Sequence, residues 1–246
     1  MASKRYYVLD GIRGLALINM IAYHACWDLV YMFGMDWKWY KSEAAYVWQQ
    51  GICWTFIFLS GFCWSMGRHH IKRGFTVFAG GAVISAVTFL AMPQNRVAFG
   101  VLTLIGSCML IFAALDKILR KINSAAGLAI SAVLFFFTRN VNQGYLGFES
   151  HNICRLPDAL YKNMITAYIG FPYSGFFSTD YFSVIPWIFL FSVGYFLYRL
   201  AERGQMLFAF EKSIVAWLEW LGKYSFWIYM AHQPLIYVIL LIALGQ

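Results

Sequence analysis

Residues 13–24 read RGLALINMIAYH, an apolar run that begins with an arginine and ends with a histidine. The apolar character extends over residues 8–33, which is longer than the roughly 20 residues that a membrane-spanning helix needs. Asp10 and Asp28 also lie in this segment, so four ionisable side chains accompany one hydrophobic helix. The segment is therefore either a hydrophobic helix with paired charges at its ends or a helix that carries a functional site.

The composition predicts a membrane protein. Of the 246 residues, 61% are hydrophobic, 20% are aromatic and only 12% are charged, whereas soluble domains average about 25% charged residues. One soluble core of this size could not bury 10 Trp, 23 Phe and 16 Tyr side chains. We therefore expect an all-α, polytopic membrane helix bundle in a single domain over residues 1–246.

Apolar stretches of spanning length recur along the chain and predict about seven transmembrane helices. The expected spans are roughly 8–33, 46–66, 74–92, 97–115, 125–141, 181–200 and 224–244. Residues 207–222 mix apolar and charged side chains, which is typical of an amphipathic helix at the membrane surface. Residues 142–180 form one long connection, and its aromatic content predicts an ordered, functional loop. We read the first span as retained and not as a signal peptide, because polar residues interrupt it.

The basic residues predict an orientation. The chain has 19 Lys and Arg against 11 Asp and Glu, a net charge of +8, and in a membrane protein such an excess collects in cytoplasmic loops. Twelve of the 19 lie in loops on the side of the N-terminus, six lie in the opposite loops, and Arg13 lies within the first span. This bias predicts that the N-terminus lies in the cytoplasm and the C-terminus outside. It also accounts for the net positive charge, so no nucleic-acid partner is expected.

The cysteines predict neither a disulfide nor a metal centre. Four of the five lie in apolar segments, where a free thiol behaves as a small hydrophobic group. Cys154 lies in a polar stretch without an evident partner. The sequence contains no CxxC pair and no Cys/His spacing suited to zinc, so no metal is expected.

On a helical wheel at 100° per residue, the ionisable residues of the first helix form one stripe. Relative to Asp10, the positions of Arg13, His24 and Asp28 fall at about 300°, 320° and 0°, whereas Asn19 falls on the opposite side. Ionisable side chains in a membrane face a bundle interior or a wet cavity, because exposure to lipid is costly. A salt bridge between Asp10 and Arg13 would account for these two charged residues, at the end of the helix predicted to be cytoplasmic, without any functional site. It does not explain His24, which lies about 16 Å further along the helix.

The residue types in this stripe suit distinct tasks. Histidine can abstract a proton near neutral pH, so His24 is a candidate general base. Asp28 lies one turn away and is placed to orient the imidazole or stabilise its cation. Arg13 cannot act as a base, but a guanidinium can hold an anionic group in a bidentate manner.

Several motifs carry a family resemblance. LDGIRGLALINMIAYH (9–24) resembles the opening helix of the transmembrane acyltransferases, including the Arg–His spacing of acyltransferase family three. FIFLSGFCWSMGRHHIKRG, which ends at Gly74, resembles the second span of that superfamily and its basic turn. The closer resemblance is to small bacterial membrane proteins grouped with the heparan-alpha-glucosaminide N-acetyltransferase catalytic domain. FGVLTLIG (99–106), STDYFSVIPW (178–187) and WLGKYSFWIYMAHQPLIY (220–237) resemble the later motifs of that group in the same order.

The resemblance implies transfer of an acyl group, acetyl in the simplest case, from cytoplasmic acyl-CoA to a hydroxyl or amine of a sugar-like acceptor. His24 would be the catalytic histidine. Arg13, with Asp10 beside it, and the basic turn of Arg68, Lys72 and Arg73 would bind the CoA phosphates. The general excess of Lys and Arg in cytoplasmic loops explains the charge of that turn equally well. His69 and His70 are expected to be structural.

Three residues are candidates for the acceptor side. Asp180 and Tyr181 enter from the long outer loop, and His232 lies near the outer end of the last span. A helix-capping role competes for Asp180. For His232 the competing role is structural, because Pro234 frees a backbone carbonyl nearby. Many relatives have histidine where this chain has Thr103, and the larger lysosomal enzymes have parts that this chain lacks, so heparan sulfate itself is not the expected substrate.

Two other classes of function remain open from the sequence. His24 and His232 on separate spans could ligate a haem, which would make the protein an electron carrier. A helix bundle with polar groups could also be a transporter or a lipid-binding protein, although no inverted repeat is visible. The resemblance implies a bacterial cytoplasmic (inner) membrane location, and the sequence leaves open whether the protein forms a homodimer.

Overall fold

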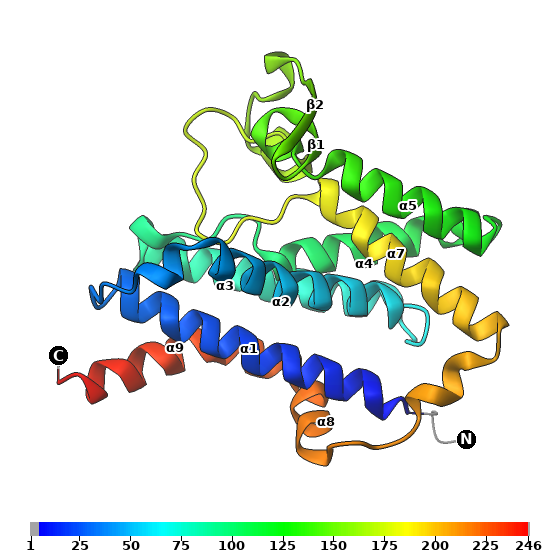
Figure 1. Ribbon diagram of the computed structural model, residues 1–246, viewed down its shortest axis with the longest axis horizontal. Coiled ribbons are helices and arrows are strands. Elements are labelled where there is room, and N and C mark those ends of the chain that lie inside the picture. Colours follow the sequence, from blue (N-terminus) through cyan, green and yellow to red (C-terminus); the bar gives the residue numbers. More distant parts are fainter. Residues whose placement is uncertain (1–4, 246) are drawn as a thin grey trace. The chain divides into compact units, whose positions relative to one another are not determined.

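The computed structural model describes residues 5–245, and within that range the chain is mainly helical, with one short hairpin (Figure 1). The helices are α1 (Tyr7–Tyr31), α2 (Glu43–Phe62), α3 (His70–Ala91), α4 (Val101–Leu119), α5 (Ser124–Thr138), α6 (Met164–Ile169), α7 (Val184–Arg203), α8 (Ala216–Lys223) and α9 (Ser225–Ala243). Each of the seven expected spans coincides with one long helix, displaced by a few residues at most. The helical class expected from the sequence is confirmed.

Five segments are long and apolar enough to cross a membrane: α3, α4, residues Ser124–Gln143, α7 and α9. The helices α1 and α2 are also long, but they are not in this group. Both carry several polar side chains, which lower their mean hydropathy. These helices indicate an integral membrane protein with five candidate spans, and the full count of seven stays a prediction.

The chain folds into two compact units. The terminal unit comprises residues up to Phe56 and from Gln205 onward, and the middle unit comprises Ile57–Gly204. Each unit is described by itself below. The single domain expected over residues 1–246 stays a prediction.

In the terminal unit, α1 packs against α8 and α9 (Figure 1). The crossing with α8 depends on two glycines. A Cβ atom at Gly14 would lie 2.0 Å from the carbonyl oxygen of Leu218, and one at Gly222 would lie 1.8 Å from that of Asp10. Small residues at such crossings let helix backbones approach closely. Beside this crossing, Leu17, Met20 and Ile52 form a buried apolar cluster.

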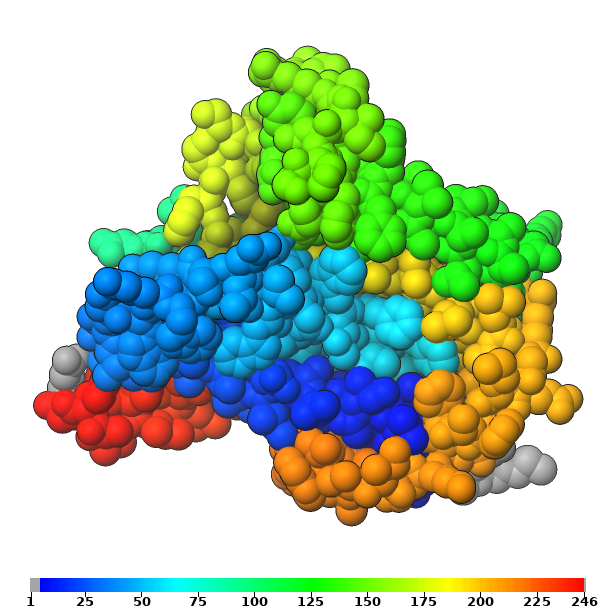
Figure 2. All heavy atoms as spheres, in the orientation of Figure 1, coloured from blue at the N-terminus to red at the C-terminus, as the bar shows by residue number. Residues whose placement is uncertain are grey.

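In the middle unit, α3 packs on α4 and α5 packs on α7. A Cβ atom at Gly61 would meet the Phe191 carbonyl oxygen at 2.0 Å, and one at Gly194 would meet that of Phe58 at 2.2 Å, so the end of α2 contacts α7 through glycines. The long connection is ordered, as expected from its aromatic content. It contains the hairpin β1 (Tyr145–Phe148) and β2 (His151–Arg155), followed by α6. Figure 2 shows this hairpin as a compact green lobe next to α5.

The amphipathic segment over residues 207–222 is less regular than expected. Met206–Phe210 form a 3₁₀ turn, and only Ala216–Lys223 form an α-helix. The buried Glu219 carboxylate accepts hydrogen bonds from the Ser213 hydroxyl and from the N–H groups of Ile214 and Val215. These bonds fold the chain back just before α8, which explains why one continuous helix does not form.

Candidate functional site

The N-terminal end of the predicted stripe is an ion-pair group. The Asp10 carboxylate lies 3.0 Å from Nη1 of Arg13, one turn along α1, and 2.9 Å from the Arg5 guanidinium. These contacts match the structural alternative for Asp10 and Arg13. The Arg13 side chain as a whole is 22% exposed.

The opposite side of α1 faces another helix, as the wheel predicts for Asn19. The Asn19 side-chain oxygen accepts a hydrogen bond from the Trp48 indole N–H of α2 at 3.0 Å. Its amide group donates to the Leu15 carbonyl oxygen at 2.9 Å. Asn19 is therefore a packing residue, and the stripe is left to face α8 and α9.

His24 meets His232 of α9. The two ring centroids are 4.9 Å apart and the ring planes are inclined at 61°. The Tyr23 ring lies edge-on to His24 at 6.1 Å. Among the described residues the His24 ring contacts these two rings and forms no hydrogen bond, so its nitrogens are not committed to a structural role.

His232 is buried and its ring orientation is fixed. Nδ1 lies 2.5 Å from the Tyr229 carbonyl oxygen, which can only accept. Nδ1 must therefore carry the hydrogen, and in the neutral ring Nε2 carries a lone pair. Nε2 is buried and has no hydrogen-bond partner among the described residues. His232 therefore makes a structural contact, but with the Tyr229 carbonyl and not with the Met230 carbonyl that Pro234 leaves without a helical donor.

Asp28 is fully buried and contacts α9 through Gln233. Its Oδ1 accepts a hydrogen bond of 2.6 Å from the Gln233 side-chain amide. Within residues 5–245 no hydrogen bond joins Asp28 to His24, so the orienting contact expected one turn away is replaced by one to Gln233. Asp28 Oδ2 and Gln233 Oε1 are buried and lack partners in the described chain. We call His24, Asp28, His232 and Gln233 the polar cluster.

An open groove of about 370 Å³ adjoins the polar cluster. His232 is its one ionisable lining residue, and the remaining side chains are apolar. They come from α1 and α9: Ile21, Trp227, Ile228, Ala231, Leu235, Ile236 and Ile239. His232 thus connects the buried polar groups with an accessible surface.

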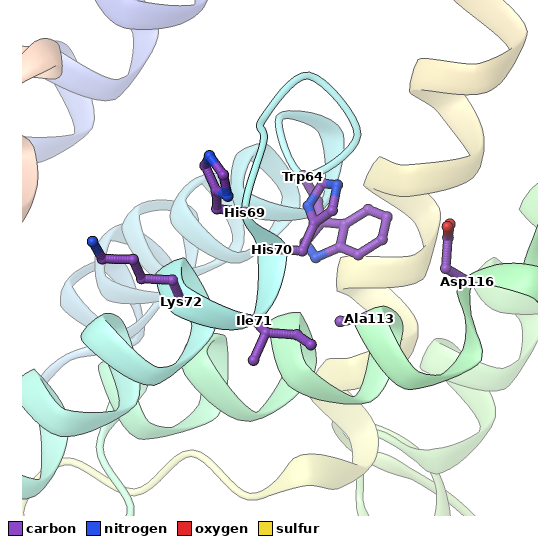
Figure 3. Close-up of a pocket in the computed structure, with 7 residues that line it drawn as sticks. All are labelled: Trp64, His69, His70, Ile71, Lys72, Ala113 and Asp116. Atoms are coloured by element: carbon purple, nitrogen blue, oxygen red, sulfur yellow. The ribbon is translucent and has the colours of Figure 1, made fainter.

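The middle unit holds a second concave site, at the basic turn. Its pocket of about 580 Å³ lies between the start of α3 and the end of α4 (Figure 3). The Trp64 and His70 rings stack there at 4.0 Å, with Lys72 and Asp116 on opposite sides of them. Trp64 is held by a hydrogen bond from its indole N–H to the Met109 carbonyl oxygen. His69 also lines the pocket and adopts a left-handed backbone conformation before α3.

The basic residues predicted to bind CoA differ in placement. Lys72 lines the pocket and is exposed. Arg68 is exposed but does not line it. The Arg73 guanidinium packs against the turn, where a Cβ atom added to Gly67 would lie 1.4 Å from Nη1. Of the three, Lys72 is therefore the residue that this pocket presents.

Asp180 and Tyr181 take part in a network that joins two loops of the middle unit. Asp180 Oδ2 lies 3.5 Å from the Val101 N–H at the start of α4, so its capping contact is with α4 and not with the helix that follows it. Burial raises the pKa of Asp180 to about 6, although the Val101 N–H opposes this shift. The Tyr181 hydroxyl donates to the Ala167 carbonyl oxygen of α6, and burial raises its pKa to about 12. Both contacts are structural.

Thr103 lies at the crossing of α3 and α4. It is buried, and a Cβ atom at Gly81 would lie 2.5 Å from its backbone nitrogen and from Oγ1. A histidine ring here would need a different separation of the two helices. The small threonine side chain is thus matched to a close helix contact.

The comparisons with known proteins agree with the motifs. The family model described as heparan-alpha-glucosaminide N-acetyltransferase, catalytic, matches residues 5–234. The chain belongs to this family. Membership indicates a membrane acetyltransferase, and such enzymes in general use acetyl-CoA as the donor. No curated protein and no solved structure matches the chain significantly.

The family match covers both the helix that carries the stripe and the segment MAHQ at 230–233. Sequence reasoning found three of the four residues of the polar cluster and missed Gln233. The only signal for Gln233 was its position next to His232, because its partner Asp28 lies 205 residues earlier in the chain.

Proposed function

We propose that this member of the heparan-alpha-glucosaminide N-acetyltransferase family transfers an acetyl group from acetyl-CoA to a hydroxyl or amine of a sugar-like acceptor. His24 is the general base. The observation that carries this proposal is the polar cluster, in which a histidine without a committed hydrogen bond lies against a second histidine of fixed tautomer.

In the proposed reaction His24 takes the proton from the acceptor oxygen or nitrogen as that atom attacks the thioester carbon. The carbon–sulfur bond then breaks and the CoA thiol leaves with a proton. No cysteine or serine nucleophile is required, because both substrates are bound together. Proton transfer by a positioned histidine accounts for about 10²- to 10⁴-fold in rate.

Basic residues are proposed to hold the donor. Within the terminal unit the candidate is Arg13, whose side chain is 22% exposed beside Asp10. Within the middle unit the candidate is Lys72, which presents an exposed ammonium at the pocket of the basic turn. Arg68 and Arg73 add positive charge to the same turn. Asp116 also lines that pocket, but it is paired with Arg120 at 2.9 Å, which offsets its repulsion of a phosphate.

The geometry favours this function over a haem-based one. Axial histidines lie on opposite faces of the macrocycle, whereas the rings of His24 and His232 are in edge contact at 4.9 Å. This contact leaves no layer for a porphyrin between them. A transporter would not need a histidine of fixed tautomer at this position.

The test is acetyl-CoA turnover by the purified full chain with D-glucosamine as the probe acceptor. We expect His24→Ala to lower kcat by about 10²-fold or more, while His151→Ala, on the exposed hairpin, serves as the matched control. Equal rates of CoA release and acetyl transfer in His24→Ala and the parent protein would show that His24 is not the base.

A further inference from the structure

In the connection between α3 and α4, a guanidinium group is held between two aromatic rings of the middle unit. The guanidinium carbon of Arg96 lies 5.9 Å from the centre of the Phe89 ring and 5.4 Å from that of the Phe177 ring. Such contacts are attractive, because the face of an aromatic ring is electronegative. Phe89 belongs to the last turn of α3, whereas Phe177 belongs to the long connection before α7. Two distant segments of the chain therefore orient one cation.

Hydrogen bonds to the backbone hold Phe177 beside Arg96. The Thr179 N–H donates to the Arg96 carbonyl oxygen at 3.1 Å. The Ser178 hydroxyl oxygen accepts from the Ala98 N–H at 2.9 Å. Both bonds involve residues that directly follow Phe177, so this part of the connection is fixed against the segment that carries Arg96. The guanidinium is thus clamped before any ligand binds.

No carboxylate neutralises Arg96 in the part of the chain that the structure describes. Its side chain forms no ion pair there, and its one hydrogen bond is a long contact of 3.5 Å to the Pro93 carbonyl oxygen. Arg139 and Arg155, which are predicted to lie on the same side of the membrane, both pair with a carboxylate. Asp180, on the same connection as Phe177, contacts the start of α4 instead. A half-buried, oriented cation without a counter-ion is suited to bind an anion.

The place of Arg96 in the fold indicates where the anion comes from. Arg96 lies between the candidate spans α3 and α4 and therefore at a membrane boundary. The surface beside it is apolar, since Phe89 is 45% exposed, Phe177 is 46% exposed and Leu90 is 87% exposed. At such a boundary an arginine reaches the lipid headgroups while its neighbours contact the acyl chains. A phospholipid satisfies both the cation and the apolar surface, whereas a soluble anion satisfies the cation alone.

We propose that Arg96, Phe89 and Phe177 form a binding site for an anionic glycerophospholipid. The guanidinium donates to the phosphate diester, for which its planar shape is suited. A zwitterionic headgroup binds less tightly, because the described residues of the site offer its ammonium group no carboxylate. The site is separate from the proposed donor site and goes beyond the proposed function. It lies at the end of α3 opposite the basic turn, and the 22 residues of α3 span about 33 Å.

Native mass spectrometry of the full chain in detergent tests this site, because it resolves each bound lipid molecule. The probes are dioleoyl phosphatidylglycerol, which is anionic, and dioleoyl phosphatidylcholine, which has the same acyl chains and a zwitterionic headgroup. We expect the parent protein to bind its first phosphatidylglycerol at least about threefold more tightly than its first phosphatidylcholine.

Two variants remove separate parts of the site. Arg96→Gln is expected to weaken the tightest phosphatidylglycerol binding by about three- to tenfold and to abolish the preference for that lipid. Phe177→Ala keeps the charge but removes one ring, and we expect a loss of about two- to fivefold. Arg155→Gln is the matched control. It makes the same change in net charge, but its arginine is exposed and paired with Asp158, so the parent affinity is expected. Melting curves confirm that each variant is folded.

Four results would overturn this inference. The first is unchanged phosphatidylglycerol affinity in Arg96→Gln or Phe177→Ala. The second is an equal loss in Arg155→Gln, because net charge alone would then explain the binding. The third is equal affinity of the parent protein for both lipids. The fourth is displacement of the lipid by excess inorganic phosphate, which would assign the cation to a free anion. We expect inorganic phosphate to leave the lipid bound.

Discussion

At the scale of single residues, Asp180 gives the most direct pH-dependent prediction. Its pKa is raised to about 6 from an ordinary value of 3.8, mainly by burial. The folded state therefore binds more protons than the unfolded state between these values. The contribution of Asp180 to stability is fully present below about pH 4 and is lost as the pH rises through about 6.

Asp180→Asn should remove this dependence, because the amide stays neutral and its oxygen can still accept from Val101. We expect the variant to melt about 2–6 °C above the parent protein at pH 7.5 and to show a smaller difference at pH 4.5. Thermal unfolding in detergent across this range measures both. A constant difference between the two proteins at every pH would contradict the assigned pKa shift.

The sequence predicts which residues share a face of α1 better than it predicts which residues they contact. Periodicity placed His24 and Asp28 on one side and Asn19 on the other, and the contacts with His232 and Trp48 agree. Periodicity also predicted that Asp28 contacts His24, because the two residues are one turn apart on the same helix. The actual bond to Gln233 depends on the register between two helices at opposite ends of the chain, which a single sequence does not contain.

At the scale of elements, the crossing of α1 and α8 makes a test of helix packing. Gly14→Ala places a Cβ atom 2.0 Å from the Leu218 carbonyl oxygen, so α8 must move. We expect a loss of about 1–3 kcal/mol in stability, as in overpacked cores. Gly51→Ala in α2 is the matched control, because nothing lies within 4 Å of its added Cβ atom. That variant should be stabilised by about 0.5–1 kcal/mol through helix propensity.

Denaturant unfolding of the two variants beside the parent protein measures this difference. If Gly14→Ala is as stable as Gly51→Ala, the close approach of α1 and α8 is not present in solution.

The irregular segment before α8 shows what hydropathy alone does not predict. Its cause is a local set of hydrogen bonds to Glu219, a residue that composition simply counts as charged.

At the scale of the whole molecule, the open matter is how many helices cross the membrane. Five candidate spans and seven spans are both odd numbers, so both counts predict that the two termini lie on opposite sides of the membrane. The side of the membrane on which the loops before and after α2 lie distinguishes five spans from seven. If α1 and α2 both span, residue 41 lies outside and residue 68 lies inside, in agreement with the bias of the basic residues. If neither spans, both residues lie on the same side as the N-terminus.

Single cysteines at Lys41 and Arg68, in a chain whose five native cysteines are replaced, can report this topology. Both positions are exposed in the structure. We expect a membrane-impermeant maleimide to label Lys41→Cys in intact cells and to label Arg68→Cys only after lysis. Labelling of both only after lysis would remove α1 and α2 from the spans. The polar cluster would then have to function outside the hydrocarbon layer, where water could satisfy the polar atoms that lack partners in the described chain.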